Sequence, residues 1–145
     1  MFKKILFPTD FSDVSQKAVK YIKQLKGAGA QEVIVLHVID EKELQVLSRV
    51  PDQYLQITTL MEKEIAKEMD AVEADMTAEG FSVKLKVKTG KPFTEIMNTA
   101  AEEKVSVIVV GSHGKSNIGE MLMGSVSENV IRHAKVPLLV ISREI

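Results

Sequence analysis

Five short apolar segments alternate along the chain with segments in which apolar residues recur at helical spacing. The apolar segments are rich in β-branched residues, which favours strands; they cover residues 3–9, 33–39, 83–87, 105–110 and 137–142. Strict alternation of strand and helix favours right-handed βαβ units in an open parallel sheet with helices on both faces. Two of the segments are apolar almost without interruption, as expected for strands that are buried on both sides.

Four helices are predicted between these strands. The first follows Ser12, a candidate N-cap, and ends at the glycines within 27–29. The second and longest stops near Gly80, the third starts at Pro92, and the fourth begins near Ser125. Helical spacing predicts four buried faces: Val14, Ala18, Ile22 and Leu25; Ile57, Met61, Ile65, Met69, Val72 and Met76; Phe93, Ile96, Met97, Ala100 and Ala101; and Val126, Val130, Ile131 and Ala134.

The carboxyl ends of three predicted strands carry the polar and glycine residues that could form a binding site. In open α/β sheets, ligands bind beyond these ends, where the strand order reverses. The first strand is followed by residues 8–12, the second ends in 36–40, and the fourth leads into 111–114. If the first and fourth strands are neighbours, the three segments converge on one crevice. Residues 40–51, the one long polar connection, are expected to form a mobile loop.

A spaced pair of glycine motifs follows the fourth strand. Gly111 and Gly114 stand at the strand exit, and nine residues later Gly124 and Ser125 open the fourth helix. Glycine lets backbone N–H groups come close to an anion, and a helix start adds unpaired N–H donors and a positive dipole end. Ser125 and Ser127 add hydroxyl groups at the same place. These features predict a phosphate cradle, with a nucleotide as the first ligand to consider.

Other nucleotide and catalytic motifs do not fit. A P-loop ending in 114–116 would require glycine at Val109, and a dinucleotide motif starting at Gly27 would require glycine at Glu32. Neither a G-x-S-x-G nor an H-E-x-x-H motif occurs, which argues against serine hydrolases and zinc proteases.

Asp10 and the three histidines are the remaining candidates. Asp10 could bind a ribose hydroxyl, an adenine amine or a metal, or it could serve only as a turn residue ahead of the first helix. His37 lies in a predicted strand, where a partly buried structural role is the favoured interpretation. His113 could approach a phosphate or could be an exposed loop residue. His133 ends the fourth helix, where it is expected to be structural.

Composition narrows the function classes. The 145 residues fit one domain, and 19 Lys and Arg nearly balance 20 Asp and Glu, so no global field would recruit nucleic acid or an anionic membrane. The absence of cysteine excludes disulfides, thiolate metal sites and cysteine nucleophiles. No apolar run approaches the roughly 18–20 residues that a membrane span needs, and the apolar run near the N-terminus is too short for a signal peptide. A cytoplasmic location is therefore expected.

Several segments, in order, resemble the universal stress protein family. They are residues 3–12, 35–38, 89–92, 109–130 and 136–141, of which 109–130 is the most specific. The resemblance covers nearly the whole chain and implies one domain over residues 1–145. It implies an adenine nucleotide alpha hydrolase-like fold with five parallel strands in the order 3-2-1-4-5.

The resemblance also implies a ligand. Family members that bind ATP are similar in carrying G-x2-G-x9-G-[ST], which this chain matches, so it is identified with the ATP-binding subgroup. By that resemblance, phosphates and ribose would contact Gly111, Gly114, Gly124, Ser125, Val126 and Ser127, and the adenosine end would contact Pro8, Asp10 and Val38. Mg²⁺ or Mn²⁺ would be bound through the phosphates. The resemblance further implies a homodimer and a role in stress response.

Three functions stay open at this point. The first is an ATP-binding regulatory or sensor protein, a homodimer joined through its last strand. The second is an enzyme with slow ATP hydrolysis at most, or one that transfers a phosphoryl or adenylyl group, for which Asp10, His113 and Lys115 are the nearby candidates. The third is a nucleotide-free interaction module in which the glycine loop is only structural.

Overall fold

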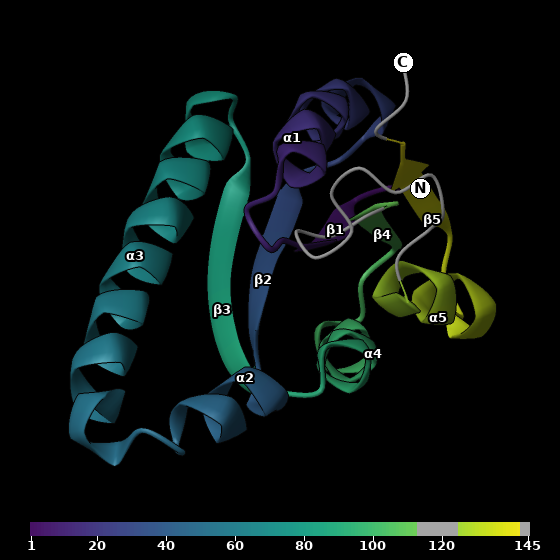
Figure 1. Ribbon diagram of the computed structural model, residues 1–145. Coiled ribbons are helices and arrows are strands. Elements are labelled where there is room, and N and C mark those ends of the chain that lie inside the picture. The colour runs from purple at the N-terminus through teal and green to yellow at the C-terminus, as the bar shows by residue number, and fades with distance from the viewer. Residues whose placement is uncertain (113–124, 143–145) are drawn as a thin grey trace.

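Strand β1 (Lys4–Pro8) lies at the centre of a five-stranded parallel sheet with the order β3-β2-β1-β4-β5. The computed structural model describes residues 1–112 and 125–142 (Figure 1). The other strands are β2 (Glu32–Asp40), β3 (Ser82–Gly90), β4 (Val107–Gly111) and β5 (Leu138–Ile141). β1 pairs with both β2 and β4, so the strand order reverses at this strand. The predicted fold class and strand order are confirmed.

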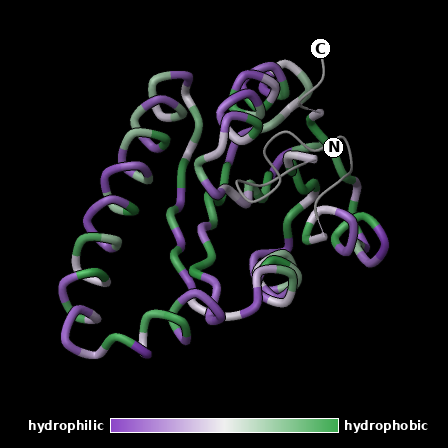
Figure 2. The backbone as a smooth tube through the Cα atoms, viewed as in Figure 1, coloured by the Kyte–Doolittle hydropathy of each residue, from purple (hydrophilic) through white to green (hydrophobic). Residues whose placement is uncertain are grey.

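Helices cover both faces of the sheet. On one face, α1 (Asp13–Leu25) and α3 (Pro51–Ala78) enclose a core that includes Ile5 and Phe7 of β1 (Figure 1). On the other face, α4 (Pro92–Glu103) and α5 (Ser125–His133) pack over Leu6. Along α3, hydrophobic and hydrophilic residues alternate within the turns, as a helix with one buried side requires (Figure 2).

The segment 40–51 is not the long loop that its polarity predicts. Asp40 ends β2 and caps a short helix, α2 (Glu41–Leu47), by accepting a hydrogen bond from the Lys42 N–H at 2.9 Å. α3 then begins at Pro51, well ahead of Ile57, the first of its predicted apolar positions. The prediction was wrong because α2 spans only seven residues and buries none of them completely, and so short a segment shows no clear apolar period.

Two further expectations need correction. Ile131 and Ala101 were expected on buried helix faces. Ile131 is 38% exposed and Ala101 is exposed as well, because α5 buries only Ser127 and Val130 and α4 only Ile96 and Thr99. The third strand was predicted over 83–87 and runs over Ser82–Gly90. Its outer residues pair with β2 along the whole length of β2, and this pairing depends on tertiary contacts that a local apolar pattern does not contain.

The ends of the two long helices follow the predicted chemistry. The Ser12 hydroxyl caps α1 by accepting a hydrogen bond from the Ser15 N–H at 3.3 Å. Gly29 and Gly80 follow α1 and α3 with φ of 100° and 96°, a conformation that a side chain would disfavour. The Lys26 amine donates a hydrogen bond to the Glu79 carbonyl and so joins these two turns.

Candidate functional site

A cavity of about 520 Å³ lies at the carboxyl ends of β1, β2 and β4. Seven of the nine residues predicted to bind the nucleotide line it together: Pro8, Asp10, Val38, Gly111, Ser125, Val126 and Ser127. The other two, Gly114 and Gly124, lie outside the described residues, as do His113 and Lys115. The predicted convergence of three strand ends on one crevice is therefore confirmed, and the cavity has a size typical of small-molecule sites.

The cavity exists because β1 stops while β2 continues. The last pair in their register is Pro8 with Leu36, and the Leu36 carbonyl accepts one more hydrogen bond from the Thr9 N–H at 2.8 Å. In a strand, backbone polar groups point to alternate sides from one residue to the next. Val38 therefore directs its N–H and C=O to the same side as Leu36, into the space beyond the end of β1. A lining side chain was predicted here, and the structure adds a backbone donor and acceptor.

Asp10 is held in a tight network at the start of α1. Its Oδ1 accepts hydrogen bonds from the Ser12 N–H at 3.0 Å and from the Ser15 hydroxyl at 3.2 Å. The preceding Thr9 hydroxyl accepts one from the Phe11 N–H at 3.0 Å. Asp10 thus fills the turn role that was considered for it and also lines the cavity. Because this carboxylate is already fixed, it loses little conformational entropy when a ligand hydroxyl donates a hydrogen bond to it.

His37 and Phe11 form a stacked pair at the cavity wall. Their ring centroids are 4.7 Å apart with an interplanar angle of 24°. His37 Nδ1 lies 2.8 Å from the Thr9 carbonyl oxygen, so Nδ1 carries the proton in this contact. Phe11 has a φ of 64°, a left-handed conformation that is unusual for an aromatic residue. The half-buried, hydrogen-bonded His37 agrees with its expected structural character.

The opposite end of the cavity is formed by the end of β4 and the start of α5. Gly111, Ser125 and Val126 line this end, and the Ser127 hydroxyl donates a 2.6 Å hydrogen bond to the Gly111 carbonyl. That bond ties the helix start to the strand end. The first N–H groups of a helix have no partner within it, and the dipole makes this end positive. The geometry is therefore suited to an anionic group.

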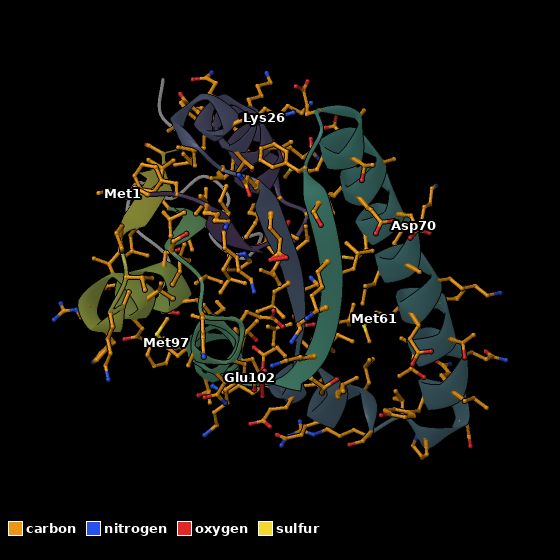
Figure 3. The ribbon with its side chains drawn as sticks, turned by 180° about the vertical axis from the view of Figure 1, so that it is seen from behind. Met1, Lys26, Met61, Asp70, Met97 and Glu102 are labelled. Carbon is orange, nitrogen blue, oxygen red and sulfur yellow. The ribbon has the colours of Figure 1, made fainter. Side chains whose placement is uncertain are left out.

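The sequence-based interpretation did not include the cavity wall contributed by α2 and α3. Met61, Glu64, Ile65 and Glu68 of α3 and Glu43 of α2 line the cavity. Met61 and Ile65 were expected only in the core, and Met61 is seen between α3 and β3 in Figure 3. The one local signal was the spacing of Glu64 and Glu68, which places both on one side of the helix. The position of α3 over the sheet depends on tertiary contacts, which the local sequence does not show.

His133 and Met97 lie away from this cavity, on the α4 and α5 side. His133 Nδ1 is 2.9 Å from the Asn129 carbonyl, within the last turn of α5, and its ring meets Phe93 edge-on. The predicted structural role of His133 is thus confirmed. Met97 projects from α4 on the side of α5 (Figure 3).

A separate group of charges covers the α4 side of β3. Glu103 of α4 contacts Lys86 at 2.7 Å, Lys84 at 2.9 Å and Lys4 at 3.3 Å, and its side chain is only 10% exposed. The hydrogen bonds from Lys86 and Lys84 lower the pKa of Glu103 to about 2. Next to it, Glu102 pairs with Lys88 at 3.1 Å, near the lower end of β3 in Figure 3.

The described part of the chain offers neither a metal-binding cluster nor a membrane-spanning helix. No group of three or more His, Cys, Asp or Glu residues in that part of the chain could hold a metal ion. None of the described helices combines the length and the apolar character needed to cross a membrane.

Comparison with known proteins gives a consistent match over the whole chain. The family model of the universal stress protein family matches residues 1–142. The universal stress protein MJ0577 of Methanocaldococcus jannaschii is 38% identical over 157 residues, which cover 99% of this chain and 97% of that protein. A solved structure of MJ0577 superimposes with a TM-score of 0.90 at 41% identity, covering 99% of this chain and 98% of the other.

Two other solved structures were determined with adenine nucleotides. A universal stress protein in complex with cAMP has a TM-score of 0.68 at 23% identity and covers 97% of both chains. The universal stress protein from Archaeoglobus fulgidus in complex with dAMP has a TM-score of 0.65 at 20% identity, covering 97% of this chain and 99% of the other. At these identities the likeness shows the shared fold. The match to the family model and the identity to MJ0577 go further: this chain belongs to the universal stress protein family.

Proposed function

We propose that this protein binds ATP in the cavity at the carboxyl end of its sheet and acts as a regulatory or sensor protein in the cytoplasmic stress response. The proposal rests on one observation: the start of α5, the backbone of Val38 and the fixed carboxylate of Asp10 all line one cavity. Each matches a different part of a nucleotide. The cAMP and dAMP complexes of proteins with this fold support an adenine nucleotide as the ligand class.

At the adenosine end, the backbone of Val38 would read the base. Adenine presents an acceptor and a neighbouring amine donor on one edge, which complement a backbone N–H and C=O. Guanine presents the opposite order, with a carbonyl and a ring N–H. Pro8 supplies an apolar wall, and Asp10 would accept a hydrogen bond from a ribose hydroxyl. GTP should therefore compete with ATP only weakly.

At the other end, the start of α5 would hold the phosphates. Backbone N–H groups and the exposed Ser125 hydroxyl are the donors there. The Ser127 hydroxyl already donates to Gly111, so its role would be to fix the helix start. Mg²⁺ or Mn²⁺ would neutralise part of the phosphate charge when bound. The glycine motif that includes Gly114 and Gly124 resembles that of the ATP-binding family members and supports ATP as the ligand.

The first test is the absorbance of the gently purified protein. With no Trp and two Tyr, its own absorbance at 280 nm is weak, so a co-purified adenine nucleotide would dominate near 260 nm. ATP should then bind saturably in the presence of Mg²⁺ or Mn²⁺ by calorimetry. If neither a 260 nm excess nor saturable binding is found, the protein is better described as an interaction module. Turnover faster than nucleotide exchange would instead favour an enzyme.

We also propose that the protein is a homodimer joined through β5. β5 lies at one edge of the sheet, where the backbone groups of residues 138–141 have no further strand to pair with among the described residues. Pairing with a symmetry mate would satisfy these groups across an isologous interface. Sedimentation should give a dimer at micromolar concentration, weakened by charged substitutions at Leu138 and Val140. A monomer in wild type, or a dimer that both substitutions leave intact, would count against this interface.

A further inference from the structure

The backbone N–H of Val38 does not form the hydrogen bond to the Thr9 carbonyl that continued strand pairing would give it. If the parallel ladder between β1 and β2 continued by one step, the Thr9 carbonyl would accept a hydrogen bond from the Val38 N–H. That carbonyl is instead bound by the side chain of His37, at 2.8 Å from Nδ1. The His37 side chain thus takes the place of the next backbone hydrogen bond between β1 and β2.

His37 also contacts the residue on the other side of Asp10. Its ring stacks on Phe11 at 4.7 Å, while its nitrogen binds Thr9, so the two contacts span the Asp10 position. Phe11 adopts a left-handed backbone conformation, which is not that of a strand, so β1 cannot continue regularly through this residue. The stacked Phe11 ring and the Thr9 hydroxyl that binds the Phe11 N–H together hold the turn in this shape.

We infer that His37 is a positioning residue for the adenosine end of the site: by occupying the Thr9 carbonyl, it ends the β1–β2 ladder and leaves the Val38 N–H for a ligand. The inference rests on the proposed function and deepens it. His37 touches no nucleotide atom in this scheme and acts through Thr9 and Val38. Without the His37 side chain, β1 and β2 would form one more hydrogen bond, from the Val38 N–H to the Thr9 carbonyl. The Val38 N–H would then no longer be available to bind the adenine base.

The main test compares two ligands in wild type and His37→Ala. ATP engages both ends of the site, whereas inorganic tripolyphosphate with Mg²⁺ engages the phosphate end alone. We expect His37→Ala to weaken ATP binding about tenfold, the worth of one hydrogen bond, and to leave tripolyphosphate binding unchanged. An equal loss for both ligands, or an unchanged affinity for ATP, would overturn the inference.

Two further substitutions separate the hydrogen bond from the ring contact. His37→Asn keeps a side-chain donor for the Thr9 carbonyl and should retain most of the ATP affinity, whereas His37→Phe keeps a ring beside Phe11 and should behave like His37→Ala. The reverse order would show that the stack, and not the hydrogen bond, matters. His133→Ala is the matched control, because His133 also binds a backbone carbonyl and meets a phenylalanine ring, but away from the cavity. It should change neither affinity.

Amide hydrogen exchange of Val38 tests the idea without any ligand. In wild type this amide should exchange faster than its neighbours in β2, and in His37→Ala it should become protected as the extra hydrogen bond forms. A Val38 amide that is already as protected as the rest of β2 in wild type would contradict the inference. If wild type binds neither ligand, the proposed function fails, and the exchange measurement still decides the role of His37.

Discussion

Charged side chains gather in two regions of this molecule, and the two regions use them differently. On the α4 side of β3, Glu103 is surrounded by three lysines, each within 3.3 Å of a carboxylate oxygen. At the carboxyl end of the sheet, Glu64 and Glu68 line the cavity and form no ion pair with the described residues. Charges that meet their partners inside the fold contribute to stability, whereas charges around a cavity shape what can enter it.

The same contrast holds for backbone groups. Along the β2–β3 pair the ladder runs without interruption from Glu32 to Asp40. Beside it the β1–β2 ladder stops at Pro8, and the strand edge beyond faces the cavity. Regular pairing thus stabilises one side of β2, and its interruption leaves the cavity on the other. Substitutions in the two regions should accordingly affect different measurements.

Among these substitutions, Asp10→Ala is expected to have the largest effect, a loss of affinity for ATP. Loss of a hydrogen bond to a charged group, worth roughly 1.5–3 kcal/mol, should lower the affinity for ATP by one to two orders of magnitude. Calorimetric titration of ATP with Mg²⁺ measures it, and a urea melt shows whether the protein stays folded. Asp75→Ala, which removes an aspartate paired with Lys23 far from the cavity, should leave binding unchanged. Full affinity for ATP in Asp10→Ala would show that this carboxylate does not contact the ligand.

Ser125→Ala should have a smaller effect at the other end of the cavity. It removes the hydroxyl but keeps the backbone N–H at the start of α5, so we expect about a tenfold loss of ATP affinity. Thermal stability should hardly change, because Ser125 is exposed. Thr59→Ala, at an exposed hydroxyl on α3, is the control. Equal binding by all three proteins would mean that this hydroxyl does not contact the phosphates.

Glu103→Gln should show the opposite profile, with lower stability and unchanged ATP affinity. The folded carboxyl has a pKa of about 2, against 4.5 when unperturbed, so its stabilising effect is fully present above pH 4.5 and is lost as the pH falls through 2. After allowance for solvent screening of the lysines, we expect a loss of roughly 1–2 kcal/mol at pH 7. Urea unfolding of both proteins at several pH values tests this. A difference that grows on acidification would have the wrong sign.

Lys88→Ala should have the smallest effect. Its partner Glu102 is exposed, and exposed ion pairs contribute less than about 1 kcal/mol. A double-mutant cycle for Lys88 and Glu102, set beside one for Lys86 and Glu103, measures the two pairs on the same scale. Equal coupling energies would show that burial of Glu103 adds nothing to its pairing.

Much of the architecture could be predicted because each element carries its own local signal. Ser12 marks the start of α1, Pro92 the start of α4, and the continuous apolar residues of β2 indicate a strand covered on both faces. α2 could not be predicted, since it spans only seven residues and buries none of them completely. The extra length of β3 depends on its pairing with β2, which is a contact between distant parts of the chain.

The site divides in the same way. Asp10 and Gly111 stand directly after the predicted strands 3–9 and 105–110, so the rule for open sheets points to them. The contributions of Met61 and Glu68 depend on how α3 lies over the sheet, and the contact between His37 and Thr9 depends on where β1 ends relative to β2. Sequence spacing contains neither piece of information.

The lysines of β3 have a consequence for assembly. An open sheet has two outer strands, and each could in principle recruit another molecule. Lys84, Lys86 and Lys88 place charged side chains along one of them, and another strand could pair there only by desolvating these lysines and their glutamate partners. The outer strand at the far side, Leu138–Ile141, carries no charge. Polymerisation through the sheet would require both outer strands to pair. If β5 pairs with a second copy as proposed, β3 provides no second pairing edge, so association should end at closed dimers and not proceed to fibres.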